Sequence, residues 1–549
     1  MSRKLFIGII GILISLIASH TCFADPLWYG NIVSVSGDTA LLEFRGLEKK
    51  HDMSCVISTR ECSETSPFLT NTILSPNTSS HKNNFRFPSI SIHRNGSSNN
   101  IFKFYTTISS SNKRTLSLVN TKTKKTYSIS SALHFWNLLD LQPRVSKFSP
   151  DNTKLAYIDD RSGFISLYIT NLTTLSKTGL SGTKITSDVS VGDFTFADSH
   201  TLLYVANTTN DPYDWVLYSY DTNTQVTTSL AHHLTYDSIL HQSGNSIVFT
   251  KLGPLGTIPV ILTDYHGIDL QDFKLPISTP ASTNTISYTY QNIAGFDTVV
   301  MSNHTIDTVK HPLIIWLHGG PYRQSSFVRH TYISYGVYDW DLEQAVNQGA
   351  YVVKIDYPGS YGSGRKNTES IKSGVGLVDV KSVEDVINDF VAHNTVDGVY
   401  LVGNSYGGYL ALRTAVAYPD QVDGALSING ITDWQSLMIF YKNSIFNEFF
   451  GGLPSSHNKK LFAQASIFSR VKNLKHPVYI IQGEVDSTVP KFQATTLKSA
   501  LDTAGKQSML LMIPNENHVF EKDSSINTIC TTLFQMVGFS DTSSCNLNG

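Results

Sequence analysis

Short strands alternate with polar turns through the first half of the chain. Segments such as "DTALLEF", "KLAYID", "ISLYIT", "TLLYVAN" and "WVLYSYD" are apolar or aromatic, and Asn, Asp, Gly and Ser separate them. Units of strand, turn, strand, turn and strand recur at a period of roughly 40 to 50 residues, which is typical of propeller blades. We therefore predict an all-β propeller over residues 25–285, with a β-sandwich as the alternative. The segment before Leu139 is too irregular for a count of blades.

From about Ser287 the pattern changes to apolar strands alternating with helices. The expected strands are "PLIIWLHGGP", "AYVVKIDYPGS", "VYLVGNS", "GALSING", "PVYIIQGEVD" and "SMLLMIP". Continuous apolar strands with intervening amphipathic helices predict a mostly parallel, doubly wound sheet that is covered on both faces. This α/β domain is expected over residues 286–549.

One amphipathic helix is especially clear between the second and third of these strands. In "DVKSVEDVINDFVAHN", the apolar residues Val380, Val383, Ile387, Phe390 and Val391 recur at helical spacing and fall on one face. Further helices are expected over residues 405–417, 491–504 and 526–536.

The first 24 residues have the pattern of a secretory signal peptide. Arg3 and Lys4 precede an apolar run from Leu5 to about Ala18, and small residues suited to cleavage lead up to Ala24. An uncleaved membrane anchor is the alternative, but the apolar run is short for a span. The sequence predicts export to the periplasm or the cell exterior, with cleavage near Ala24 and no membrane span in the mature chain.

Export permits disulfides, and four cysteines remain after the predicted cleavage site. They form two local pairs, one near each end of the chain. We predict the disulfides Cys55–Cys62 and Cys530–Cys545, with four free buried thiols as the alternative. Neither pair has the spacing of a redox dithiol or of a zinc site.

Composition and charge narrow the class of protein. The chain has 549 residues, of which 41% are hydrophobic and 16% charged, and its formal net charge is -2. This balance gives no electrostatic footprint for nucleic acid or for an anionic membrane. The three histidines His232, His233 and His241 are better explained by strand turns than by a metal site, and we expect no metal or organic cofactor.

The junction in "VYLVGNSYGGYL" is the first candidate for chemistry. Ser405 lies between Gly403 and Gly407 where a predicted strand meets a predicted helix. In an α/β sheet, Gly-x-Ser-x-Gly at such a junction forms a strained turn that exposes the serine hydroxyl. Ser405 is therefore the candidate nucleophile.

A serine hydroxyl needs a histidine base, and that base needs an orienting carboxylate. Asp486 follows the strand "PVYIIQG", and His518 follows the strand "SMLLMIP", so both lie in loops after strands. Glu484 is the rival acid, but Asp486 lies further into its loop. The order Ser405, Asp486, His518 is the order that this fold requires.

Acyl transfer also needs donors for the oxyanion of the tetrahedral intermediate. The backbone N–H of Tyr406, directly after the nucleophile, is one candidate. The second is the N–H of Gly320 in "WLHGGP", where glycines let the backbone approach a substrate. A simple glycine turn before Pro321 is the alternative.

The ordered strings "LHGGP", "DYPGSYGSGR", "GNSYGGY", "GEVDSTVP" and "NENHVF" resemble the catalytic domain of the prolyl oligopeptidase family of serine peptidases. The resemblance covers residues 287–538 and is strongest to the acylaminoacyl-peptidase-like branch. It implies an α/β-hydrolase domain after a propeller, with Ser405, Asp486 and His518 as the triad and Gly320 and Tyr406 at the oxyanion positions. Asn404 departs from the bulky aromatic residue common there, which we expect to alter the rim of the substrate pocket.

Specificity is less readable. The resemblance places an apolar pocket after the nucleophile, and we expect Ile431, Trp434 and Phe446 to line it; ordinary helix core is the alternative. Dipeptidyl-peptidase relatives hold the amino terminus of the substrate with paired glutamates, but this chain has none between Glu64 and Glu343. Asp159 and Asp160 could imitate the pair, although a strand-end turn explains them better.

The sequence thus predicts a secreted or periplasmic serine peptidase that acts on short peptides, with the propeller restricting access. Two other functions stay open. One is an esterase or lipase using the same triad, and the other is a non-catalytic binding protein that uses the propeller surface. The sequence does not predict the preferred residue, exo- as against endo-cleavage, or the oligomeric state. A homo-oligomer is compatible with it.

Overall fold

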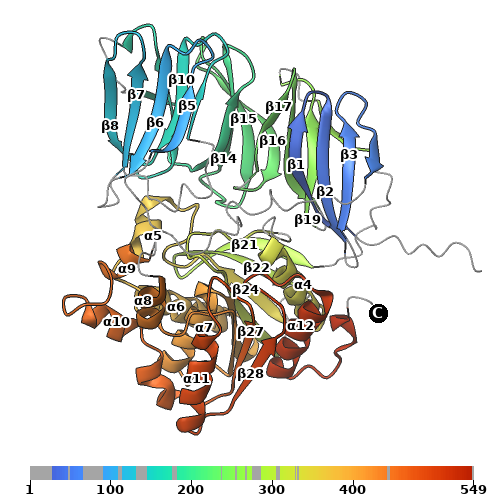
Figure 1. Ribbon diagram of the computed structural model, residues 1–549. Helices are drawn as coiled ribbons and strands as arrows, with labels where there is room; N and C mark the ends of the chain where they lie inside the picture. The colour runs from blue at the N-terminus through green and yellow to red at the C-terminus, as the bar shows by residue number, and fades with distance from the viewer. Residues whose placement is uncertain are drawn as a thin grey trace, which may run out of the picture.

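The structure is a computed structural model, and two domains stack on one another in it (Figure 1). It describes residues 27–46, 50–65, 91–108, 114–131, 145–175, 182–236, 238–253, 256–265, 269–274, 286–303, 309–327, 329, 333–441 and 446–546. The predicted signal peptide, residues 1–24, lies outside the described residues.

The N-terminal domain consists of four-stranded antiparallel sheets, five of them within the described residues. The first two contain β1 (Leu27–Ser36), β2 (Thr39–Gly46), β3 (Lys50–Val56) and β4 (Cys62–Glu64), then β5 (Ser91–Gly96), β6 (Phe102–Ile108), β7 (Arg114–Asn120) and β8 (Thr126–Ser131). The other three contain β9 (Ser146–Phe148), β10 (Lys154–Asp159), β11 (Ser166–Asn171) and β12 (Thr183–Lys184); β13 (Val191–Phe196), β14 (Thr201–Asn207), β15 (Trp215–Asp221) and β16 (Thr227–Leu234); and β17 (His241–Ser243), β18 (Ser246–Gly253), β19 (Gly256–Leu262) and β20 (Leu270–Asp272).

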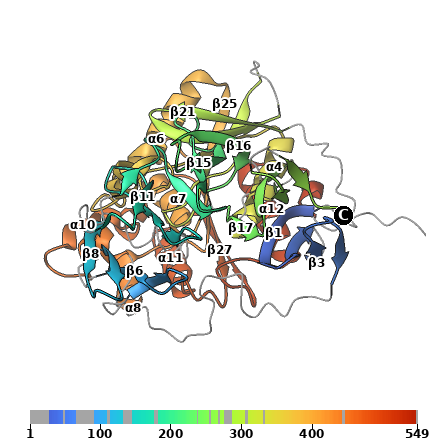
Figure 2. The same ribbon diagram turned by 90° about the horizontal axis from the view of Figure 1, so that it is seen from above.

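These sheets are arranged as propeller blades. The last three begin at Ser146, Val191 and His241, which agrees with the predicted period. Every residue of the neighbouring strands β13 and β14 is buried, because sheets lie on both sides of them. Viewed from above, the sheets follow one another in an arc, and sheet β1–β4 lies beside sheet β17–β20 (Figure 2). Five successive four-stranded sheets rule out the two-sheet sandwich.

Backbone hydrogen bonds join the first sheet to the last. The N–H of Lys274 donates to the oxygen of Arg60 at 2.9 Å, and the N–H of Cys62 donates to the oxygen of Lys274 at 3.3 Å. The segment after β20 therefore continues the pairing of the first sheet, which fixes the two ends of the N-terminal domain to each other.

The C-terminal domain is built on one eight-stranded sheet with the order β21-β22-β24-β23-β25-β26-β27-β28. The hairpin β21–β22 is antiparallel and pairs antiparallel with β24, whereas the strands from β24 to β28 are parallel. The strands are β21 (Ser287–Ile293), β22 (Phe296–Ser302), β23 (His311–Leu317), β24 (Tyr351–Ile355), β25 (Val396–Asn404), β26 (Gly424–Ile428), β27 (Val478–Gly483) and β28 (Ser508–Ile513). The mostly parallel sheet predicted from the sequence is confirmed.

Helices cover both faces of this sheet, as Figure 1 shows. Alternate residues of β23 enter opposite cores: Leu313 and Ile315 pack in one with α6 (Val378–His393), α7 (Tyr406–Ala417) and α11 (Phe492–Thr503). Ile314 and Trp316 pack in the other with α4 (Ile333–Asn347) and α12 (Asp523–Val537). The remaining helices are α5 (Gly364–Ser370), α8 (Trp434–Tyr441), α9 (Asn447–Phe450), α10 (Lys459–Ala465), η1 (Phe468–Asn473) and η2 (Ser543–Cys545).

The predicted helices are present, with two differences. In α6, Val380, Val383, Ile387 and Phe390 are buried, but Val391 is 41% exposed. Val391 directly follows Phe390, and the 100° step between successive helical residues turns it away from the core. Helix α12 begins at Asp523 rather than at Ile526, since polar residues form its first turn and hide the start from the apolar pattern.

Both predicted cysteine pairs are disulfides in the structure, Cys55–Cys62 and Cys530–Cys545. The first links β3 to β4, and the second links α12 to η2. Among the described residues, no helix has the length and apolar character needed to cross a membrane.

Candidate active site

Ser405 occupies the sharp turn between β25 and α7. Its φ of 58° and ψ of -117° are strained for a residue with a side chain. The helix passes so close to β23 that a Cβ atom on Gly407 would lie 1.8 Å from the oxygen of Leu317. On Gly403, a Cβ atom would lie 2.3 Å from the carbonyl carbon of Gly407. Only glycine fits either position, so the motif forms the strained strand-to-helix turn that the sequence predicted.

Asn404, just before the turn, fixes the end of β25 through hydrogen bonds of its side chain. Its side chain is 2% exposed and donates to the oxygen of Ile428 at 3.2 Å and to the hydroxyl of Tyr338 at 3.3 Å. The N–H of Ser405 donates to the same Ile428 oxygen at 2.9 Å. From the sequence we expected Asn404 to alter the rim of a pocket, and this expectation is wrong. Its amide instead donates to a backbone oxygen inside the domain.

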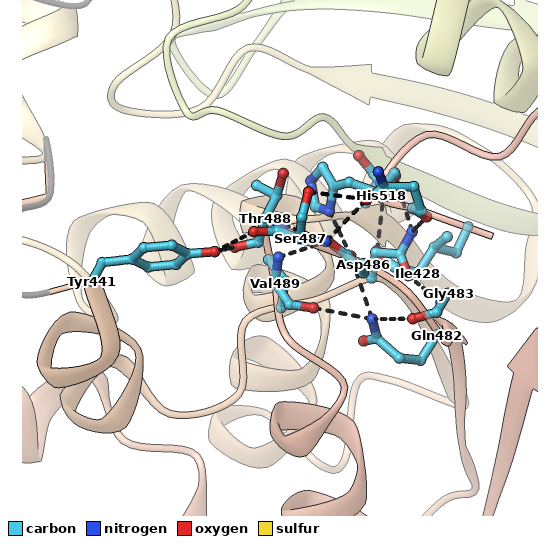
Figure 3. Close-up of polar contacts among 12 residues, drawn as sticks. Ile428, Tyr441, Gln482, Gly483, Asp486, Ser487, Thr488, Val489 and His518 are labelled. Carbon is cyan, nitrogen blue, oxygen red and sulfur yellow. Dashed lines mark hydrogen bonds and ion pairs between the residues drawn. The ribbon is translucent and has the colours of Figure 1, made fainter. Parts of the chain in front are cut away.

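Asp486 lies in the loop after β27, and its side chain is fully buried. One carboxylate oxygen accepts the N–H groups of Thr488 at 2.7 Å and Val489 at 2.8 Å. The other accepts the Gln482 amide at 3.3 Å and contacts Nδ1 of His518 at 2.8 Å (Figure 3). The loop thus fixes the carboxylate and aims one oxygen at the imidazole.

Glu484, the rival acid, points elsewhere. Its side chain is 42% exposed and lies 3.6 Å from the ammonium of Lys491. Of the two acids, Asp486 is the one whose carboxylate the structure brings to His518.

His518 lies in the loop after β28, with 18% of its side chain exposed. The contact with Asp486 engages Nδ1, so Nε2 lies on the opposite side of the ring from this carboxylate. Asn517 steadies both loops, since its side-chain oxygen accepts the N–H of His518 at 2.8 Å and that of Ser487 at 3.0 Å.

Asn429 is a residue of the site that the sequence prediction missed. It is fully buried at the end of β26, and its φ of 48° is one that Asn tolerates better than most residues. Its side-chain oxygen accepts the N–H of Gly483 at 2.7 Å, and its amide donates to the oxygens of His518 at 3.0 Å and Asn517 at 3.3 Å. The signal available was a polar residue directly after a strand, "SINGIT", between the strands of Ser405 and Asp486.

Tyr441 ties the acid loop to the end of α8. Its hydroxyl donates to the carbonyl oxygens of Ser487 at 2.5 Å and Thr488 at 2.8 Å, as Figure 3 shows. Burial, and secondly the charge of Asp486, raise the pKa of Tyr441 to about 12. The hydroxyl therefore stays protonated, and remains a donor, well above neutral pH.

The sheet brings Ser405, Asp486 and His518 to one edge. Strands β25, β26, β27 and β28 are adjacent and parallel, so the loops that follow β25, β27 and β28 leave at the same end. This carboxyl edge is where open α/β sheets carry their ligand sites. The three predicted residues therefore lie on loops that leave the sheet at the same end.

The two predicted oxyanion donors also lie at this edge. Tyr406 begins α7, and the first N–H groups of a helix have no acceptor within it. Gly320 follows β23, which pairs directly with β25 through Leu317 and Gly403. The backbone that leads to Gly320 is thus the backbone that α7 packs against.

A buried polar cluster supports the turn around Gly320. His318 is 2% exposed; its Nε2 lies 2.9 Å from the hydroxyl of Ser360 and 3.5 Å from the carboxylate of Asp356. The hydroxyl of Tyr357 donates to the carbonyl oxygen of His318 at 2.5 Å, and its ring stacks on that of Tyr406 at 5.8 Å. Tyr357 therefore contacts both donor segments, His318 just before Gly319 and Gly320, and Tyr406 itself.

The predicted pocket residues lie beside the nucleophile but largely inside the core. Ile431 and Trp434 are each 2% exposed, while Phe446 is partly exposed. Trp434 contacts the rings of Tyr406 at 5.6 Å and Phe446 at 5.0 Å, and the N–H of Ile431 donates to the oxygen of Ser405 at 3.3 Å. Their role as a substrate pocket stays a prediction.

The two adjacent aspartates of the N-terminal domain form a strand-end turn. Asp159 ends β10 and lies 3.3 Å from the guanidinium of Arg161, and the N–H of Gly163 donates to the backbone oxygen of Asp160 at 2.9 Å. Both side chains are buried. This is the turn that the sequence favoured.

The sequence model of the prolyl oligopeptidase family matches residues 336–536. This range contains Ser405, Asp486 and His518 in the order that the geometry requires. Residues 336–536 form a prolyl oligopeptidase family domain.

Curated relatives of this family domain agree. The chain is 26% identical over 246 residues to acylamino-acid-releasing enzyme of Rattus norvegicus. The aligned segment covers 41% of this chain and 31% of that protein. The chain is also 26% identical over 232 residues to dipeptidyl aminopeptidase BIII of Pseudoxanthomonas mexicana, covering 40% of this chain and 32% of the relative. The chain spans about a third of the length of these relatives.

Solved structures match nearly the whole chain. A puromycin-hydrolyzing peptidase of Mycobacterium tuberculosis has a TM-score of 0.68 at 15% identity, covering 94% of this chain and 95% of that one. At this identity the likeness concerns the fold, and it confirms a β-sheet domain followed by an α/β-hydrolase domain.

Proposed function

We propose that this chain is a serine peptidase that hydrolyses peptide bonds of short peptides. The observation that carries the proposal is the 2.8 Å contact between His518 Nδ1 and the buried carboxylate of Asp486, at the sheet edge where the strained turn presents Ser405. The family domain and the names of the peptidase relatives give independent support.

In the proposed reaction, the Ser405 oxygen attacks the scissile carbonyl carbon while Nε2 of His518 accepts its proton. Asp486 keeps the proton of His518 on Nδ1 and stabilises the imidazolium. The N–H groups of Tyr406 and Gly320 donate to the oxyanion. The imidazolium then protonates the leaving amine, and water, deprotonated by the same histidine, releases the acyl group from Ser405.

The proposal extends to substrate and compartment. The N-terminal domain stands over the α/β domain (Figure 1), so we propose that it limits access to short peptides. We also propose that the chain is exported through its first 24 residues, with cleavage near Ala24. Two local disulfides, Cys55–Cys62 and Cys530–Cys545, support an oxidising compartment.

A substrate panel tests the activity. Wild-type protein and Ser405→Ala are incubated with a peptide library, with one folded protein, and with an amide and an ester of the same acyl group. We expect products from peptides of limited length, none from the folded protein, and no turnover by Ser405→Ala. Turnover of the ester without any peptide cleavage would make the protein an esterase and refute the proposal.

A further inference from the structure

The segment that carries Gly320 is anchored in the N-terminal domain through Gln324. This glutamine is 1% exposed, and both ends of its amide bind residues of that domain. Its oxygen accepts the indole N–H of Trp215 at 2.9 Å, and its nitrogen donates to the oxygen of Pro212 at 2.8 Å. Trp215 begins β15, and Pro212 lies in the turn before it.

A second segment of the α/β domain reaches the same place. The hydroxyl of Tyr361 donates to the oxygen of Val191 at 3.2 Å, and its ring stacks on Trp215 with centroids 5.9 Å apart and planes 10° apart. The oxygen of Gly362 accepts the side-chain amide of Asn207 at 3.1 Å. Val191, Asn207 and Trp215 all belong to the sheet β13–β16.

The two segments are also bonded to each other. The N–H of Tyr361 donates to the oxygen of Arg323 at 2.9 Å, and the hydroxyl of Ser360 lies 2.9 Å from Nε2 of His318. Trp215 therefore contacts both segments. It donates to Gln324 in the chain after Gly320, and it stacks on Tyr361 in the loop whose Ser360 contacts His318. The Trp215 indole and the Gln324 amide are both buried, so water does not compete for the hydrogen bond between them.

We infer that Trp215 and Gln324 are positioning residues of the oxyanion hole. Through their hydrogen bond, the N-terminal domain sets the place of the Gly320 N–H and contributes to the rate of the chemical step, in addition to limiting access. The inference rests on the proposed function. Oxyanion donors act only when they are fixed close to the position of the developing charge, and small displacements are costly.

The test removes the hydrogen bond and keeps the packing. Trp215→Phe retains an aromatic ring against Tyr361 but lacks the indole donor. Gln324→Met removes the acceptor of that bond and, in addition, the donor to the oxygen of Pro212. Each variant is assayed on an ester and on the thionoester of the same acyl group, in which sulfur replaces the carbonyl oxygen. Sulfur is a weak hydrogen-bond acceptor, so the ratio of kcat/KM for ester over thionoester reports the oxyanion hole.

We expect kcat for the ester to fall by between about tenfold and a hundredfold with little change in KM. The ester-to-thionoester ratio should fall with it, because the thionoester depends less on the donors. Tyr218→Phe is the control: Tyr218 lies in the same strand and stacks on Tyr204 at 5.2 Å, within its own sheet. It should leave both kcat and the ratio at the wild-type values.

Other outcomes separate the inference from the proposed function. If both variants fold, as judged by thermal unfolding, and keep the wild-type ratio, the inference is wrong even when their activity is lower. If one variant does not fold, the ratio measured on the other decides. If wild-type protein hydrolyses neither ester nor peptide, the proposed function is wrong, and the inference falls with it.

Discussion

Asn429 offers a sharp perturbation, because one amide holds three loops of the site together. Asn429→Asp keeps the oxygen that accepts the Gly483 N–H at 2.7 Å. It replaces the donor that faces the oxygens of His518 at 3.0 Å and Asn517 at 3.3 Å by a second oxygen. Aspartate also tolerates the left-handed backbone, so the side-chain change is isolated from a backbone effect.

The expected magnitude follows from burial. The site is fully buried, so losing a donor there costs about 1–3 kcal/mol, and turning an oxygen toward a carbonyl oxygen adds to this. We expect the free energy of unfolding to fall by about 2–4 kcal/mol. Because the released carbonyl belongs to His518 itself, we also expect kcat/KM to fall by about tenfold to a hundredfold.

Asn458→Asp is the matched control. The Asn458 amide donates to the oxygens of Phe450, Gly452 and Leu453 at 3.0 to 3.2 Å, and its oxygen accepts the N–H of Ser455 at 2.8 Å. It is 6% exposed and lies outside the catalytic loops.

The assay combines urea unfolding with steady-state kinetics on one peptide. Asn458→Asp should lose comparable stability while kcat/KM stays close to the wild-type value. Wild-type kcat/KM in Asn429→Asp, or an equal loss of activity in both variants, would refute the role that we give to Asn429.

Three further predictions concern the acid, the tyrosine beside it and the C-terminal disulfide. Asp486→Asn should lower kcat by about 10³- to 10⁴-fold in a peptide assay, while Glu484→Gln leaves it near wild type; the reverse result would reassign the acid. The pKa of Tyr441 is raised to about 12, so the folded state holds this proton more tightly than the unfolded state, and its contribution to stability is lost as pH rises from about 10 to about 12. Urea unfolding across that window should show a smaller loss for Tyr441→Phe than for wild type, and identical slopes would contradict this. The disulfide Cys530–Cys545 joins residues 15 positions apart, so its loss in Cys545→Ser should lower the free energy of unfolding by about 3 kcal/mol in urea. An unchanged urea midpoint would show that the bond contributes nothing to stability.

The sequence predicted the elements whose pattern is local. The alternation of apolar strands with helices gave the parallel sheet, and Gly403 and Gly407 marked a turn that admits no side chain. Asp486 could be chosen over Glu484 because position in a loop after a strand is itself a structural statement. The blade period of roughly 40 to 50 residues was also predicted where the blades are regular, but the fourth strand of each sheet was not.

Non-local contacts were not readable. Asn429 bridges residues that are 54 and 89 positions away, and no spacing in the sequence announces such a bond. Asn404 was expected to alter a pocket rim because it departs from the bulky aromatic residue common at this position of the family, yet its side chain points to Tyr338 on α4. The link between Trp215 and Gln324 spans 109 positions and two domains. These residues bind partners whose proximity only the assembled sheets create.

The central claim is that Ser405 is a nucleophile activated by His518. A fluorophosphonate reacts much faster with an activated serine than with an ordinary one, so its site of attachment tests the claim directly. The protein is labelled while folded, digested, and the adduct is located by mass spectrometry. We predict one adduct on Ser405 that is lost in His518→Ala. An adduct on another serine, or no adduct in protein shown to be folded, would contradict the account.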